Sequence, residues 1–191
     1  MADIKKGSEI DIMGPLGRGY DVLSLKKGQT ALLVGGGIGV PPLYELAKQF
    51  NQRGIKTIAI LGFNTKDEVF YEEEFKKFGE TYVSTVDGSV GTKGFVTDVI
   101  KKLQAENNLV FDKYYSCGPV PMLKALISTV GEDGYVSLEN RMACGIGACY
   151  ACVCKKKKKD KDIIAYDEKK VEYTRVCYDG PVYLASDVEI E

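Results

Sequence analysis

Four cysteines carry the most informative spacing in this sequence. Cys144, Cys149 and Cys152 follow one another as Cys-x4-Cys-x2-Cys, and Cys177 comes after a long gap. In proteins with this spacing, four thiolates hold a [2Fe–2S] cluster, three of them from one loop and the fourth from a later segment. The spacing therefore predicts an iron–sulfur centre with these four residues as its metal ligands.

Two glycines and the absence of histidine bear on the alternatives to this interpretation. Gly145 and Gly147 lie between the first two cysteines, and residues without a Cβ let a backbone fold tightly around a small cluster. The alternatives are a structural zinc site or a chance arrangement. Structural zinc sites usually show two Cys-x2–4-Cys pairs or histidine ligands, and this chain contains no histidine. The pattern favours the cluster.

A second candidate site follows the apolar run at 31–34. There Gly-Gly-Gly-Ile-Gly is followed by Val-Pro-Pro and then by apolar residues at helical spacing. A buried strand, a glycine loop and a helix together bring a phosphate to the N–H groups of a helix N-terminus. The loop is not a strict G-x-G-x-x-G, so a simple tight turn is the alternative. The candidate nucleotide-binding residues here are Gly35, Gly36, Gly37 and Gly39.

The alternation of strand and helix continues to about residue 130. Strands are expected at 31–34, 57–61, 81–86 and 113–116, and helices at 43–50, 67–78, 95–103 and 120–130. Such alternation predicts an α/β fold, a parallel sheet with helices on both faces. Ligands bind beyond the carboxyl ends of the strands of such sheets. Glycine-rich loops lie at that edge at 35–42, 62–65, 87–94 and 117–120.

Two of these loops add candidate nucleotide-binding residues. Asp87 begins one of them, and Cys117, Gly118 and Pro119 form another. Cys117 is interpreted either as a small buried residue or as a neighbour of a flavin or nicotinamide, and Cys154 as a bystander of the cysteine pattern. After the second strand no arginine is placed to grip a 2′-phosphate, which favours NAD over NADP, although Lys66 lies nearby.

Composition sets broad limits on the kind of protein. The 191 residues are enough for two compact domains, and 45% hydrophobic with 28% charged residues is ordinary for a protein with a real core. A formal net charge of −1 provides no basis for nucleic-acid binding. No apolar run is long enough to span a bilayer, and the N-terminus shows no signal region. A cytoplasmic protein is expected, whose six cysteines are ligands rather than disulfides.

The two ends of the chain are expected to be β-rich. Residues 7–13 alternate like a strand, and 14–19 read as a turn-rich linker. After residue 133, short strands are expected at 135–138, 163–165, 171–176 and 182–184. The lysine run Lys155–Lys159 is interpreted as a solvated hairpin tip, with a docking patch for an acidic partner as the alternative.

The order of the motifs resembles that of a known family. Gly-Pro-Leu-Gly occupies 14–17, Leu-Leu-Val-Gly-Gly-Gly-Ile-Gly-Val-Pro-Pro 32–42, and Ser-Cys-Gly-Pro 116–119. The cysteine loop at 142–152 and Val-Cys-Tyr-Asp-Gly-Pro at 176–181 complete the series. In this order the chain resembles the electron-transfer subunits of class B dihydroorotate dehydrogenases, within the ferredoxin–NADP reductase superfamily.

The resemblance implies a fold, cofactors and a partner. A ferredoxin-reductase-type nucleotide-binding domain would precede a small β-rich [2Fe–2S] domain. NAD would exchange a hydride with FAD, and electrons would pass through the cluster to or from FMN in a dihydroorotate dehydrogenase catalytic subunit, in a hetero-oligomer. Gly35 to Gly39 would cradle the NAD pyrophosphate, and Cys117 to Pro119 would lie near the nicotinamide and flavin.

The sequence departs from the family in two places. The N-terminal FAD-binding β-barrel and its Arg-x-Tyr-Ser/Thr motif do not appear, so FAD enters only through the resemblance. The gap between Cys152 and Cys177 is also long for the family. We expect a remnant barrel strand and linker at 1–28, an NAD-binding domain at 29–132 and a cluster domain at 133–191. The alternatives are a stand-alone NAD(P)H-dependent iron–sulfur reductase and a ferredoxin-like carrier or docking module without nucleotide turnover.

Overall fold

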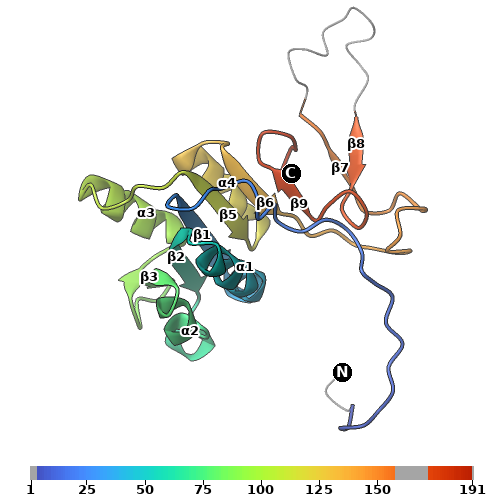
Figure 1. The fold of residues 1–191 in the computed structure, drawn as a ribbon, viewed down its shortest axis with the longest axis horizontal. Helices are drawn as coiled ribbons and strands as arrows, with labels where there is room; N and C mark the ends of the chain where they lie inside the picture. The colour runs from blue at the N-terminus through green and yellow to red at the C-terminus, as the bar shows by residue number, and fades with distance from the viewer. Residues whose placement is uncertain (1–3, 158–171, 191) are drawn as a thin grey trace, which may run out of the picture.

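A seven-stranded sheet forms the centre of the computed structural model, which describes residues 4–157 and 172–190. The strand order is β4-β3-β2-β1-β5-β6-β9, and every pair is parallel except the antiparallel β6 and β9 (Figure 1). The strands are β1 (Thr30–Gly36), β2 (Lys56–Phe63), β3 (Gly79–Thr85), β4 (Thr92–Lys93), β5 (Lys113–Cys117), β6 (Gly134–Ser137) and β9 (Val182–Leu184). The predicted parallel α/β sheet is confirmed.

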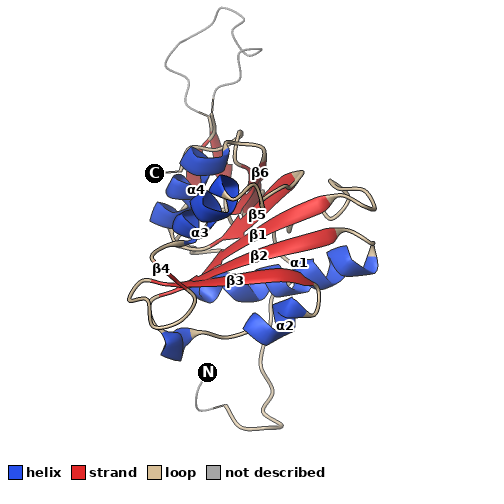
Figure 2. Ribbon diagram, turned by 90° about the vertical axis from the view of Figure 1, so that its left-hand side faces the viewer, coloured by secondary structure: helices blue, strands red, loops and turns tan. Residues whose placement is uncertain are grey.

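Helices cover both faces of this sheet, as Figure 2 shows. Helices α1 (Val40–Gln52) and α2 (Glu72–Lys76) pack on one face, and α3 (Val96–Ala105) and α4 (Val120–Val130) on the other. Because successive side chains of a strand point to opposite faces, Leu33 joins the core under α1 while Leu32 joins the core under α3 and α4. Both are fully buried, which explains the continuous apolar runs in the sequence.

The helix predicted over 67–78 is largely wrong. The structure has a short 3-10 helix, η2 (Lys66–Glu68), and then the five-residue α2 (Glu72–Lys76). Between them Tyr71 adopts a left-handed conformation, φ 64°, which a continuous α-helix does not allow. The Tyr71 ring stacks on Tyr44 of α1, with centroids 5.0 Å apart. Aromatic packing against α1 thus accompanies the break in the helical pattern.

The strand predicted over 7–13 is also wrong. No residue of that segment takes part in a strand, because a strand needs a neighbouring backbone to pair with, and none of the described residues pairs with it. The first backbone pairing of the N-terminal segment comes at Arg18, which forms an isolated bridge with Pro181. Farther on, the Tyr20 hydroxyl donates to the Ser116 carbonyl at 2.8 Å, and Leu25 is buried.

The cysteine-bearing region adjoins the sheet directly. Strands β7 (Val153–Lys155) and β8 (Tyr173–Arg175) form an antiparallel pair, and β8 leads into Cys177. The strand predicted at 163–165 lies outside the described residues. Cys152, Val176 and Cys177 share one buried cluster with Leu126 of α4 and with β6. The sheet therefore continues across the residue 132–133 boundary, through β6 and β9.

Two lysines in the described part of the lysine run make ion pairs and hydrogen bonds with neighbouring segments. Lys156 Nζ lies 3.7 Å from the Glu172 carboxylate, and Lys157 Nζ donates to Glu132 Oε1 at 2.7 Å and to the Ala185 carbonyl at 2.9 Å. Lys158 and Lys159 lie outside the described residues. Across residues 4–157 and 172–190, the helices are all too short or too polar to cross a bilayer.

Candidate iron–sulfur loop and nucleotide pocket

The cysteine loop owes its tight course to two glycines. Gly145 and Gly147 have φ of +70° and +81°, a left-handed conformation that glycine adopts without steric cost. A Cβ on Gly147 would also lie 2.8 Å from the Tyr178 Cβ, which is closer than real Cβ contacts. The loop and the segment around Cys177 therefore approach each other as closely as they do because residue 147 has no side chain.

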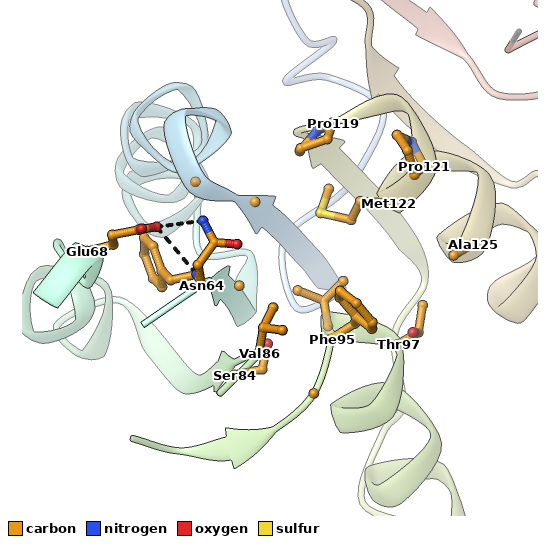
Figure 3. A pocket seen from close by; sticks show the side chains of 16 residues that line it. Asn64, Glu68, Ser84, Val86, Phe95, Thr97, Pro119, Pro121, Met122 and Ala125 are labelled. Carbon is orange, nitrogen blue, oxygen red and sulfur yellow. Dashed lines mark hydrogen bonds between the residues drawn. The ribbon is translucent and has the colours of Figure 1, made fainter. Parts of the chain in front are cut away.

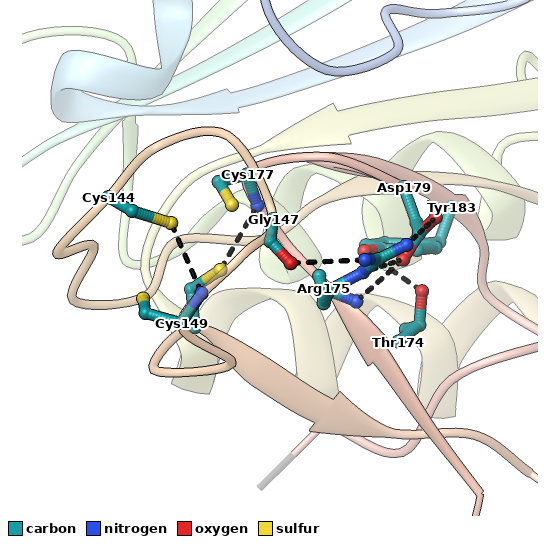
Figure 4. A network of polar contacts seen from close by, with 9 residues as sticks. Cys144, Gly147, Cys149, Thr174, Arg175, Cys177, Asp179 and Tyr183 are labelled. Carbon is teal, nitrogen blue, oxygen red and sulfur yellow. Dashed lines mark hydrogen bonds and ion pairs between the residues drawn. The ribbon is translucent and has the colours of Figure 1, made fainter.

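The four predicted cysteines lie in two pairs. The Cys149 N–H donates to Cys144 Sγ at 3.4 Å, and the Cys177 N–H donates to Cys152 Sγ at 3.4 Å (Figure 4). Among the described residues no three His, Cys, Asp or Glu side chains are arranged around a single ion. A [2Fe–2S] cluster divides its four ligands between two irons, and a donor set of two pairs suits that division.

Backbone amides prepare one of these sulfurs for metal. Backbone N–H groups, first that of Cys149 and then that of Ile146, lower the pKa of the Cys144 thiol to about 6. The thiolate is the form that binds metal, so Cys144 is largely a thiolate at neutral pH. For Cys177, the side-chain hydrogen bond with Cys152 and then desolvation raise the pKa. The loop and Cys177 thus supply the sulfur donors that an iron–sulfur cluster requires, and the loop favours the metal-binding thiolate form at Cys144.

An arginine that the sequence analysis did not single out lies behind the loop. Arg175 Nη1 donates to the Gly147 carbonyl at 3.0 Å, and its Nε donates to Asp179 Oδ2 at 2.9 Å. The guanidinium carbon also lies 4.6 Å from the centroid of the Tyr178 ring and 5.3 Å from that of Tyr150. No pattern in the sequence indicates this role, because the partners of Arg175 come from two separate segments.

A cavity that is the candidate nucleotide pocket lies at the carboxyl edge of the sheet (Figure 3). It is a cavity of about 370 Å³ bounded by the ends of β1, β2 and β3 and by the starts of α3 and α4. Of the predicted residues, Gly36, Gly37 and Pro119 line it. The loop leads through η1 (Gly37–Gly39) into α1, which has prolines in its first turn, where the missing N–H of proline has no intrahelical partner to lose.

The other predicted glycines serve close packing beside the pocket. A Cβ on Gly39 would lie 2.1 Å from the Cys117 carbonyl oxygen, and one on Gly35 would lie 2.9 Å from Val40 Cγ2. Gly118 lies against Met122, whose Cε would be 2.5 Å from an added Cβ. These residues bring the end of β1 against the end of β5, and so shape the edge at which the cavity lies.

Cys117 and Asp87 are not among the residues that line the cavity. Cys117 is buried at the end of β5, and burial raises the pKa of its thiol. The Asp87 carboxylate accepts hydrogen bonds from the hydroxyl and the backbone N–H of Ser89, at 2.6 and 2.9 Å, which lower its pKa. Asp87 is therefore an ionised group one residue beyond the pocket residue Val86.

Three residues that sequence reasoning missed face the pocket. The Asn64 side-chain amide donates to Glu68 Oε2 at 2.9 Å, which places a carboxylate at the end of β2. Ser84 Oγ is buried and has no hydrogen-bond partner in the described part of the chain. A buried hydroxyl without a partner costs about 1–3 kcal/mol. The cavity therefore offers a polar group that a bound ligand would satisfy.

The fold and the two sites together define a class of protein: an NAD-binding oxidoreductase domain joined to an iron–sulfur cluster-binding region. A family profile described as the oxidoreductase NAD-binding domain matches residues 33–127. A second, described as the iron–sulfur cluster binding domain of dihydroorotate dehydrogenase B, matches residues 139–189. The two matches fall on the pocket-bearing sheet and on the cysteine loop.

Two relatives establish the family. The dihydroorotate dehydrogenase B (NAD(+)) electron transfer subunit of Fusobacterium nucleatum subsp. nucleatum is 86% identical over 191 residues, covering 100% of this chain and 70% of the relative. That of Lysinibacillus sphaericus is 56% identical, covering 96% of this chain and 66% of the relative. The chain belongs to the family of dihydroorotate dehydrogenase B electron transfer subunits, and it spans about two thirds of these relatives' length.

A solved structure supports the same fold. It is that of an NADH-dependent reduced ferredoxin-NADP oxidoreductase, studied for flavin-based electron bifurcation. It matches with a TM-score of 0.76 and 31% identity, over 95% of this chain and 60% of that chain. The predicted ferredoxin-reductase-type fold is confirmed.

Proposed function

We propose that this chain carries electrons between NAD(H), a flavin and a [2Fe–2S] cluster, to or from the FMN-bearing catalytic subunit of a dihydroorotate dehydrogenase. Pyrimidine biosynthesis is the pathway, the assembly is a hetero-oligomer, and the location is the cytoplasm. The observation that carries the proposal is the two cysteine pairs, Cys144 with Cys149 and Cys152 with Cys177, the second of which is buried against the sheet that bears the candidate nucleotide pocket.

The cluster would be held by these four thiolates. When bound, it accepts and returns one electron at a time. The chain's own part is to favour the thiolate form of Cys144 and to position the four sulfurs. The amides of the 144–149 loop favour the Cys144 thiolate, while Cys152 and Cys177 are buried against the core beneath α4. The burial of Cys152 and Cys177 limits the access of water to that part of the site. Solvent exposure is one of the factors that set the reduction potential of a cluster.

The dinucleotide would lie along the carboxyl edge of the sheet. Gly36 and Gly37 offer backbone without side chains for the pyrophosphate, at the entry to α1. The unpartnered Ser84 hydroxyl and the Asn64–Glu68 pair are the polar groups available to the nucleoside part. The Glu68 carboxylate would repel a 2′-phosphate, which supports NAD rather than NADP.

The remaining assignments complete this proposal. Residues 29–132 would bind the nucleotide and 133–191 the cluster, with 1–28 as the preceding segment and linker. FAD is implied by the family, and Cys117 to Pro119, at the end of β5, are the residues that we propose to lie beside it. The catalytic partner's FMN would exchange electrons with the cluster, so dihydroorotate would reduce the cluster only when that partner is present.

Cys149→Ser tests the ligand assignment, with Cys154→Ser as the matched control. Cys154 lies two residues from Cys152 and is half-buried, but it stands outside the two pairs. The anaerobically purified chain should hold about two irons. We expect Cys149→Ser to lose most of that iron and the visible absorption of the cluster, and Cys154→Ser to keep both. Equal iron in the two variants would contradict the assignment.

A further inference from the structure

Arg175 joins the two segments that supply the cysteine ligands. It lies on β8, two residues before Cys177, and its Nη1 reaches the Gly147 carbonyl in the loop of the other three cysteines, at 3.0 Å. A bidentate ion pair holds the guanidinium from the other side, with Nε to Asp179 Oδ2 at 2.9 Å and Nη2 to Asp179 Oδ1 at 3.3 Å. Figure 4 shows this network beside the cysteines.

The surroundings keep the guanidinium in place. The Tyr178 and Tyr150 rings lie 4.6 and 5.3 Å from its carbon, within the range of a cation–π contact. The side chains of Arg175 and Asp179 are only 24% and 33% exposed, so solvent screens their charges less than those of a surface pair. The planar guanidinium is hydrogen-bonded on one side to Gly147 and on the other to Asp179, which fixes its orientation. The ammonium group of a lysine could not make both sets of hydrogen bonds in this geometry.

The hydrogen bond to Gly147 fixes the loop that carries three of the cysteines. The Gly147 carbonyl accepts from Arg175, and two residues further along the same loop the Cys149 N–H donates to Cys144 Sγ at 3.4 Å. A Cβ on Gly147 would lie 2.8 Å from the Tyr178 Cβ, so this loop lies against the segment that supplies Cys177. A guanidinium bound at the Gly147 carbonyl therefore keeps its positive charge beside both cysteine-bearing segments.

We propose that Arg175 is a positioning residue of the redox centre, which fixes the Gly147 peptide between the two cysteine-bearing segments, holds a positive charge there, and thereby sets the reduction potential of the cluster. Hydrogen bonds to the cluster sulfurs and nearby positive charge both stabilise the reduced, more negative form. Arg175 supplies the charge and holds in place the loop whose Cys149 N–H donates to Cys144 Sγ. Asp179 orients the arginine and offsets part of its charge.

The test is the midpoint potential of the cluster, measured by anaerobic dye titration of the reconstituted chain. Arg175→Gln should keep its iron but have a more negative midpoint potential than the parent. Arg175→Lys, which keeps the charge without the fork, should fall between the two. Lys113→Gln is the matched control, since Lys113 also pairs with an aspartate and lies 5.9 Å from a tyrosine ring, but on β5. Its potential should equal that of the parent.

Asp179→Asn keeps the test decisive if Arg175→Gln fails to hold a cluster. It retains the guanidinium and its contact with Gly147 while removing the counter-charge, so the potential should become more positive. An unchanged potential in an iron-replete Arg175→Gln, or a potential in Asp179→Asn that is unchanged or more negative, would overturn the inference. Circular dichroism of the oxidised cluster should change in Arg175→Gln and not in Lys113→Gln.

The inference rests on the proposed cluster, and iron content separates the two failures. If the parent chain held no iron, or if Cys149→Ser kept it, the cluster assignment itself would be wrong. If the parent held about two irons and the Arg175 variants shared its potential, only the role of Arg175 would be wrong.

Discussion

At the scale of the residue, close contact decides which side chains the two sites tolerate. Gly39 packs against the carbonyl of Cys117, where an added Cβ would lie 2.1 Å from the oxygen. That oxygen belongs to the backbone of β5, so it cannot rotate away as a side chain would. Any residue could adopt the φ of −76° found at position 39. Glycine is required there because a side chain would not fit against β5.

Gly39→Ala should therefore move the end of β1 away from β5 and disturb the pocket between them. Overpacking of this kind costs about 1–3 kcal/mol. We expect a lower urea midpoint for unfolding together with weaker NADH binding, measured by fluorescence titration. Gly19→Ala is the control, because a Cβ on Gly19 meets no atom within 4 Å. A Gly39→Ala chain as stable as Gly19→Ala would contradict the contact.

The site residues that the sequence reveals are close to their partners along the chain, whereas those that it does not reveal meet their partners only in the folded structure. Cys144, Cys149 and Cys152 are close in the chain, so their spacing alone predicts convergence. Arg175 donates to Gly147, 28 residues away, through a contact that only the folded chain creates. Ser84 reads as an ordinary strand residue until the fold shows its hydroxyl buried at a cavity.

At the scale of the element, the predicted strands and helices show what a local sequence pattern can and cannot reveal. The four parallel strands expected at 31–34, 57–61, 81–86 and 113–116 and the glycine loop follow from apolar runs and turn residues, and the structure reproduces them. The helix expected over 67–78 fails at Tyr71, where contacts with α1 coincide with a left-handed residue. The strand expected over 7–13 fails because pairing depends on a neighbour that periodicity cannot reveal.

Helix α3 ends on another left-handed residue, Asn107, with φ of 54°. The next N–H, that of Asn108, donates to the Leu103 carbonyl at 2.9 Å, as in a Schellman-type helix end. Asn107→Gly should raise the free energy of unfolding slightly, because glycine has no Cβ to disfavour this conformation. Asn107→Ala should lower it by about 1 kcal/mol, because alanine keeps the Cβ and lacks the short polar side chain with which asparagine tolerates the left-handed region. Urea denaturation of both variants checks this, and a more stable Asn107→Ala would contradict the geometry.

At the scale of the whole molecule, the cysteine region and the nucleotide-binding sheet share one core. Cys152, Val176 and Cys177 pack with Leu126 and Val136 in a single buried cluster, and β9 pairs with β6. Residues assigned to different cofactors thus depend on the same buried apolar surface. The two regions should unfold together rather than in sequence.

Calorimetry of the apo and cluster-loaded chains tests this cooperativity. Each form should show one transition, and loading should raise its midpoint, because a ligand that binds only the folded state stabilises everything that unfolds with its site. The unfolding midpoint followed by near-ultraviolet circular dichroism of the tyrosines in β5 should rise on loading by the same amount as the calorimetric midpoint. A second transition insensitive to loading would show that the sheet is independent of the loop.

The two outermost strands of the sheet also bear on how the protein behaves at high concentration. β4 has two residues and β9 has three, while the longest strands lie in the interior. Unpaired N–H and C=O groups at a sheet edge invite strand addition by a neighbouring molecule, and short edge strands offer few of them. The β9 border of this sheet therefore offers few such groups, whereas β4 pairs only with Ser84 and Thr85, so in the described part of the chain residues 79–83 of β3 form the stretch of edge that a neighbouring strand could extend.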